Sequence, residues 1–118
     1  MSQHQNFCMD YIEFPATDIE GTKRFYHEVF GWDFKDWGPD YVSFHDTRMG
    51  GGFTTEAQVA SGTRKGVLVV LYAANLEDTY KKVKNAGGQI VRETFEFPGG
   101  RRFHFSDPNG NELAVWSE

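Results

Sequence analysis

The chain has 118 residues and a formal charge of −5, so it is long enough for one ordinary domain and too short for two. A domain of this charge lacks the basic surface of a nucleic-acid binder, and the single cysteine, Cys8, excludes an internal disulfide and any site built from several cysteines. Apolar runs are short and the first residues lack the pattern of a signal peptide, so we expect a cytoplasmic protein without membrane contact.

The first half of the chain predicts one helix between short strands. Apolar and polar residues alternate over residues 11–14, as in a strand with one buried face. The motif Thr17-x-x-Glu20 is a capping box that begins a helix, and the apolar residues after it fall on one helical face. Gly31 ends this helix, and residues 32–37 continue as an extended stretch.

The second half repeats this order. Residues 18–22 (DIEGT) align with residues 75–79 (NLEDT), an offset of 75 − 18 = 57 residues. A strand is predicted over residues 67–72, a helix begins at Asn75, and residues 89–97 form an extended stretch. An internal repeat of this length predicts two similar structural units in one chain.

Each half closes with a predicted hairpin. Residues 41–46 (YVSFHD) align with residues 102–107 (RFHFSD). The second hairpin turns through residues 107–110, where proline presets one φ angle and Asn-Gly tolerates positive ones. Each unit therefore has the order βαβββ.

These elements predict one α+β domain over residues 1–118. It consists of two tandem βαβββ modules at about 7–55 and 66–117, with residues 54–66 as the linker between them. Alternation along the strands gives each module one apolar face, which packs under its helix. The strands should then form a curved mixed sheet with both helices on its outer face and a cleft on the other face.

The opposite face of the predicted strands collects polar and aromatic side chains. They are Tyr11, Glu13, Tyr41, Ser43, Arg102, His104, Glu112, Ala114 and Trp116. Within a curved sheet, five of them would become a polar cluster lining the cleft: Tyr11, Glu13, Arg102, His104 and Glu112.

Three segments of the chain resemble the vicinal oxygen chelate superfamily. Residues 12–20 (IEFPATDIE) and 24–32 (RFYHEVFGW) are similar to its first module, and residues 105–116 (FSDPNGNELAVW) resemble the last hairpin of its second. The likeness runs from about Phe7 to Ser117 and is strongest to small glyoxalase-like proteins. The superfamily also contains extradiol dioxygenases, fosfomycin-resistance enzymes and bleomycin-resistance proteins, so the resemblance implies the fold and leaves the reaction open.

The resemblance also implies where a metal would bind. Members that use a metal take its ligands from four strand positions, which here carry Tyr11, Phe53, Leu68 and Ala114. Divalent ions favour imidazole and carboxylate ligands, which none of these side chains supplies. We therefore predict no metal cofactor at this place, while a non-standard site with Glu13 and His104 as ligands stays open.

His104 and Glu13 are the candidate catalytic residues. His104 suits proton transfer because histidine titrates near neutral pH, although it could instead make a structural hydrogen bond across strands. Glu13 would act as a general base if it is buried, or it would form a structural ion pair with Arg102.

The candidate substrate-binding residues surround these two. Tyr11 either donates a hydrogen bond to a ligand oxygen or fills the space of the missing metal. Flat aromatic walls suit an aromatic ligand. The full predicted set is Tyr11, Tyr41, Phe53, Arg102, Glu112 and Trp116.

Two functions follow from this reading. The first is a metal-free, glyoxalase-like enzyme that uses lyase or isomerase-type acid–base chemistry on a small oxygenated metabolite. The second is a binding protein of the bleomycin-resistance type, which sequesters an aromatic or cationic small molecule. In both cases we expect a homodimer, because a thin curved sheet leaves edges and apolar surface to cover.

Overall fold

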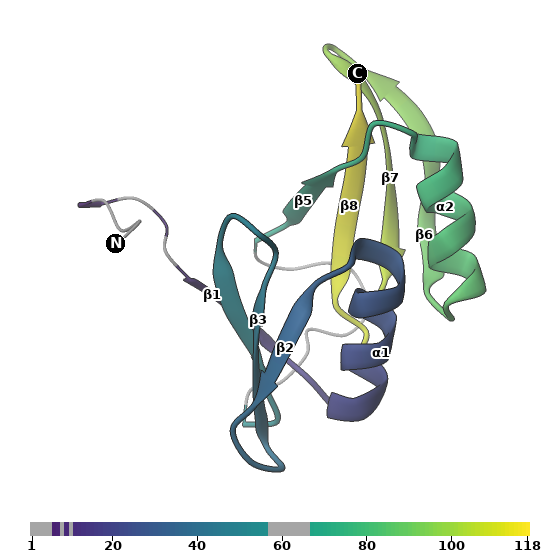
Figure 1. Ribbon diagram of the computed structural model, residues 1–118. Helices are drawn as coiled ribbons and strands as arrows, with labels where there is room; N and C mark the ends of the chain where they lie inside the picture. Colours follow the sequence, from purple (N-terminus) through teal and green to yellow (C-terminus); the bar gives the residue numbers. More distant parts are fainter. Residues whose placement is uncertain (1–5, 8, 10, 57–66) are drawn as a thin grey trace.

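The structure, a computed structural model, describes residues 6, 7, 9, 11–56 and 67–118. Its elements follow the order strand, helix and three strands twice (Figure 1). The first set is β1 (Tyr11–Pro15), α1 (Ile19–Phe30), β2 (Asp33–Asp36), β3 (Tyr41–His45) and β4 (Gly50–Thr54). The second set is β5 (Val69–Tyr72), α2 (Leu76–Asn85), β6 (Gln89–Phe97), β7 (Gly100–Ser106) and β8 (Glu112–Ser117). Residues 57–66 of the predicted linker lie outside the described residues.

Each set of strands forms its own four-stranded mixed sheet. The first sheet has the order β1-β4-β3-β2 and the second the order β5-β8-β7-β6. In each, the first strand runs parallel to the last, and the other neighbours are antiparallel. The predicted α+β architecture of two tandem modules is confirmed, with the strands divided between two sheets.

The helices begin and end close to the predicted residues. The capping residue of α1 is Asp18 rather than Thr17, because Asp18 has an extended backbone and its carboxylate accepts from the Gly21 amide at 3.0 Å. Asn75 caps α2 in the same way, and Gly31 ends α1 with a φ of 74°. Within the described part of the chain, neither helix is long and apolar enough to span a membrane.

Helix α1 contacts both sheets through one aromatic core. The Phe25 ring lies 5.9 Å from the ring of Phe105 in β7, and the Tyr26 ring lies 5.1 Å from that of Phe53 in β4. Helices α1 and α2 lie next to each other against this core (Figure 1). The apolar residues predicted on β7 and β8 are fully buried: Phe103, Phe105, Leu113 and Val115. We call the side of each sheet away from this core its open face.

Hydrogen bonds from the turn between β7 and β8 connect the second module to α1 and the residues just before it. The Tyr26 hydroxyl donates to Asp107 Oδ2 at 2.9 Å, and Asn111 Nδ2 donates to the Pro15 carbonyl at 2.7 Å. Asn109 Oδ1 accepts from the backbone amides of Thr17 and Asp18. Burial raises the pKa of the Asp107 carboxyl, which several hydrogen-bond donors partly oppose. This turn is therefore a buried polar contact between modules.

Strand β4 needs glycine where two strands press against it. A Cβ on Gly51 would overlap the ring of Phe44 and the backbone carbonyl oxygen of Ile12 in β1. A Cβ on Gly50, by contrast, would meet nothing closer than 3.6 Å. The backbone oxygen cannot move aside without disturbing the pairing of β1 with β4.

Replacing Gly51 with alanine should therefore lower the free energy of unfolding by about 1–3 kcal/mol, the usual cost of overpacking. Gly50→Ala is the matched control on the same strand and should change it by less than about 0.5 kcal/mol. Urea denaturation followed by circular dichroism measures both. Equal midpoints for the two variants would contradict the close packing at Gly51.

Candidate functional site

The candidate site is a cluster of polar groups on the open face of the second sheet. The cross-strand pairs Arg102↔Trp116 and His104↔Ala114 place Arg102, His104 and Trp116 on this face, because Phe103 and Val115 occupy the core side. The Nδ1 atom of His104 lies 2.7 Å from Glu112 Oε2. The His104 side chain is buried, with the residue 4% exposed.

The contact with Glu112 determines which ring nitrogen of His104 carries a hydrogen. An ionised carboxylate only accepts hydrogen bonds, so Nδ1 carries a hydrogen that it donates to Glu112. In the neutral imidazole, Nε2 then keeps its lone pair. Nε2 is buried and has no hydrogen-bond partner among the residues that the structure describes. His104 thus has the arrangement of a base that a carboxylate holds in one tautomer.

Aromatic rings surround Arg102 on the same face. Its guanidinium lies 5.3 Å from the Phe95 ring centre and 5.6 Å from that of Phe97. The Phe95 ring also lies 5.9 Å from the His104 ring. Further along, the Trp116 ring contacts the rings of Phe97 and Tyr72, at 6.3 and 5.2 Å. Together these rings form an apolar floor beside the polar groups.

Phe95, Phe97 and Arg92 were missed by the sequence analysis. Strand β6 has register shifts between Ile90 and Arg92 and between Arg92 and Phe95, so simple alternation fails along it. The Arg92 guanidinium lies 3.6 Å above the Phe95 ring as a result. A run of β-forming residues longer than its partner strand was the signal that could have suggested a bulge.

A second polar group lies on the open face of the first sheet. The Tyr41 hydroxyl donates to Glu13 Oε2 at 2.9 Å and is hydrogen-bonded to the Tyr11 hydroxyl. The two rings converge over Gly52, where a Cβ would overlap the Tyr41 hydroxyl. Burial raises the pKa of Tyr41 well above its usual value, and the hydrogen bonds to Tyr11 and Glu13 act in the same direction.

The structure places the predicted residues in two groups, one on each sheet. Glu13 is exposed and bonded to Tyr41, and it forms no ion pair with Arg102 in the described part of the chain. The burial that a general base at Glu13 would need is therefore missing. Phe53, predicted as a cleft wall, is fully buried in the core and stacks on Phe14 at 5.1 Å. It is not available to a ligand on the open face.

Comparison with known proteins identifies the family of this chain. The family model of the glyoxalase/bleomycin resistance protein/dioxygenase superfamily matches residues 9–115. The chain belongs to this superfamily. The resemblance found in the sequence is therefore confirmed.

Two curated relatives match most of this chain but less than half of their own length. The chain is 25% identical to a putative glyoxylase, CFP32, of Mycobacterium tuberculosis (strain CDC 1551 / Oshkosh), over 98% of this chain and 47% of the relative. It is 26% identical to the anthracycline biosynthesis protein DauV of Streptomyces sp. (strain C5), over 89% of this chain and 39% of the relative. The chain thus spans about half the length of the curated relatives it matches, or less.

Solved structures of the superfamily share the fold. A glyoxalase-related enzyme from Fulvimarina pelagi has a TM-score of 0.77 and 21% identity, covering 95% of this chain and 88% of that one. The fosfomycin resistance protein FosX from Mesorhizobium loti has a TM-score of 0.77 and 14% identity, covering 97% and 94%. At such identities the likeness concerns the fold alone.

The side chains of this superfamily member do not fit a divalent metal at the four strand positions. Leu68 and Ala114 carry no donor atom, and the open-face position of β4 is Gly52, next to the core-facing Phe53. Within residues 11–56 and 67–118, no group of three or more His, Cys, Asp or Glu side chains could hold a metal ion. We therefore derive no chemical step through a metal.

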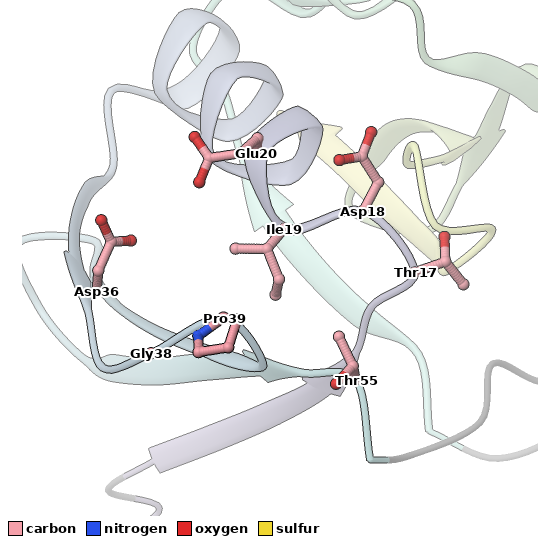
Figure 2. A pocket seen from close by; sticks show the side chains of 8 residues that line it. All are labelled: Thr17, Asp18, Ile19, Glu20, Asp36, Gly38, Pro39 and Thr55. Atoms are coloured by element: carbon pink, nitrogen blue, oxygen red, sulfur yellow. The ribbon is translucent and has the colours of Figure 1, made fainter.

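Two surface hollows of this superfamily member lie away from these groups. One, of about 590 Å³, lies between the start of α1 and the β2–β3 turn (Figure 2). Its carboxylates Glu20 and Asp36 both contact Lys23, at 3.2 and 2.9 Å. The other, of about 430 Å³, lies along α1 and β2. Neither is lined by a predicted site residue, and the polar groups of the first are already paired.

Proposed function

We propose that this chain binds a small metabolite on the open face of the second sheet and that His104 moves a proton of that metabolite. In this proposal His104 Nε2 removes a proton from carbon or oxygen of the ligand and returns it during turnover. Glu112 holds the imidazole and balances the positive charge that the ring gains. The reaction class is lyase or isomerase-type acid–base chemistry without the usual divalent metal.

One observation carries the proposal: a buried histidine has one ring nitrogen on a carboxylate and the other without a partner. A structural histidine buried in a sheet normally satisfies both nitrogens, because an unpaired buried polar atom costs about 1–3 kcal/mol. The unpaired Nε2 therefore supports a role toward a ligand. Glu13 takes no part, because it is exposed on the first sheet.

The alternative is a binding protein that holds an aromatic molecule and does not convert it. The row of Phe95, Phe97, Trp116 and Tyr72 rings favours this candidate. Such a row binds a flat molecule whether or not a base acts on it. The two functions differ in whether a proton of the ligand exchanges.

Solvent exchange of carbon-bound protons tests the proposal without a known product. We expect the protein in D₂O to speed deuterium incorporation next to the ketone of 3-benzoylpropanoate, measured by proton NMR, equally with and without EDTA. His104→Gln should abolish this acceleration. The matched control His45→Gln, at the exposed end of β3, should keep it. Binding of the probe without accelerated exchange would favour the alternative, and loss of exchange in EDTA would contradict the metal-free mechanism.

A further inference from the structure

Two neighbouring arginines on β7 have opposite surroundings. Arg101 points toward the helices, where its guanidinium forms an ion pair with Glu77 of α2. Arg102 points to the open face and has no carboxylate partner among the described residues. Its guanidinium rests on the rings of Phe95 and Phe97. The charge of Arg101 is thus paired within the fold, whereas the charge of Arg102 is available to a ligand.

Arg102 Nε is also buried, and no described residue accepts a hydrogen bond from it. A buried N–H group without an acceptor is unfavourable, and most such groups in folded proteins find one. An anionic oxygen is the acceptor that a guanidinium binds best, because the hydrogen bond is charge-assisted and two can form in parallel. The arginine therefore lacks an oxyanion partner.

The second unpaired nitrogen of this face lies close by. His104 is two residues from Arg102 on the same strand face, which places their Cα atoms roughly 7 Å apart. Both side chains flank the same Phe95 ring, at 5.3 and 5.9 Å. A ligand with its anionic group at Arg102 would therefore present the neighbouring atoms to His104 Nε2.

The floor beside Arg102 limits the shape of the rest of the ligand. Phe97, Trp116 and Tyr72 continue away from the arginine as successive edge-to-face contacts, so each ring offers its own separate face to a ligand. Flat π-systems stack on such rings better than branched aliphatic groups do. Arg92 adds a second cation over Phe95, and the open-face carboxylate Glu112 is already engaged with His104. The local charge thus favours an anion although the whole chain is acidic.

We infer that the ligand of this face is a planar molecule that carries a carboxylate, with the carboxylate on Arg102 and the flat body against the Trp116 ring. This inference rests on the proposed function in placing the ligand at the same face, and it names the class of substrate. It favours an anionic ligand over the cationic one considered for a binding protein of the bleomycin-resistance type.

Two probes that differ only in charge test the inference. Isothermal titration calorimetry should show that 2-naphthoate binds at least about tenfold more tightly than the neutral 2-naphthamide, because an ion pair with the guanidinium replaces its hydrogen bond to an uncharged carbonyl. R102Q should remove this preference, because it weakens naphthoate binding much more than naphthamide binding. R101Q is the matched control, because it changes the adjacent arginine on the other face, and it should keep the preference.

Three results would overturn the inference: equal binding of the two probes, an unchanged preference in R102Q, or no binding of 2-naphthoate at all. If R102Q does not fold, the salt dependence of the wild-type protein decides, since added salt should weaken naphthoate binding and spare naphthamide. The inference and the proposed function fail separately. A charge preference without proton exchange would contradict the catalytic role of His104. Proton exchange without a charge preference would contradict the inference that the ligand carries a carboxylate.

Discussion

Replacing Asn109 with alanine should lower the free energy of unfolding by about 2–4 kcal/mol, the cost of leaving two or more buried polar groups without partners. Asn109 is 7% exposed and lies in the β7–β8 turn. Its Oδ1 accepts from the Thr17 amide at 2.8 Å and from the Asp18 amide at 3.1 Å. Its Nδ2 donates to Thr22 Oγ1 at 2.8 Å. Alanine removes these three contacts and two longer ones, to Thr17 Oγ1 and Asp107 Oδ2 at 3.4 Å, and opens a cavity between the modules.

Asn75→Ala is the matched control for this prediction. Asn75 stands at the start of α2, and its exposed side chain accepts only from the Asp78 amide of its own helix. Loss of such a cap costs about 1 kcal/mol. Urea denaturation curves, fitted with a common slope, compare the two variants. If Asn109→Ala costs no more than Asn75→Ala, the turn does not contribute to the contact between modules.

The module order could be predicted because it depends on local patterns. Caps, helix periodicity and strand alternation repeat at one offset, and the helix end at Gly31 needs only its φ of 74°. The role of Asn109 could not be predicted in this way. Its turn was recognised from residues 107–110, but its partners lie near the start of α1, so only tertiary docking brings them together.

Phe53 shows how a small difference between the repeats misplaces a side chain. In the aligned hairpins Asp46 corresponds to Asp107, and Phe53 follows Asp46 by seven residues, as Ala114 follows Asp107. The β3–β4 connection spans residues 46–49, and the β7–β8 connection spans 107–111, so the first is shorter by 5 − 4 = 1 residue. One residue moves a side chain to the other face of a strand. Gly52, not Phe53, therefore corresponds to Ala114.

The repeat supplies two similar frameworks, and only one carries the base. His104 is paired with Ala114 on β8, and the equivalent pair in the first sheet is Ser43 with Gly52. Tyr11 and Tyr41 fill the space over Gly52 on the open face of the first sheet. On the second sheet, the small side chain of Ala114 leaves room for the imidazole of His104. The homodimer and the cytoplasmic location that the sequence suggested stay predictions. The proposed chemistry thus depends on the second module.

Replacing Glu112 with glutamine should slow the proposed proton exchange by about 10²–10⁴-fold, the range that a positioned general base contributes. The reason is the tautomer of His104. A glutamine amide can donate to Nδ1, and a neutral imidazole that accepts there must carry its hydrogen on Nε2. The lone pair that faces the ligand would then be lost, although the ring stays in the same place.

Glu93→Gln is the control, because Glu93 lies on neighbouring β6 and accepts from the Tyr80 hydroxyl of α2, away from the open face. It should leave the exchange rate unchanged. Nitrogen-15 NMR of the imidazole separates positioning from simple destabilisation, since a change of tautomer moves the Nε2 resonance toward that of a protonated nitrogen and the Nδ1 resonance in the opposite direction, while the melting temperature reports folding. Wild-type exchange in a folded Glu112→Gln protein would show that the base does not depend on this carboxylate. A slow variant with an unchanged tautomer would assign Glu112 to balancing the charge of the protonated ring instead.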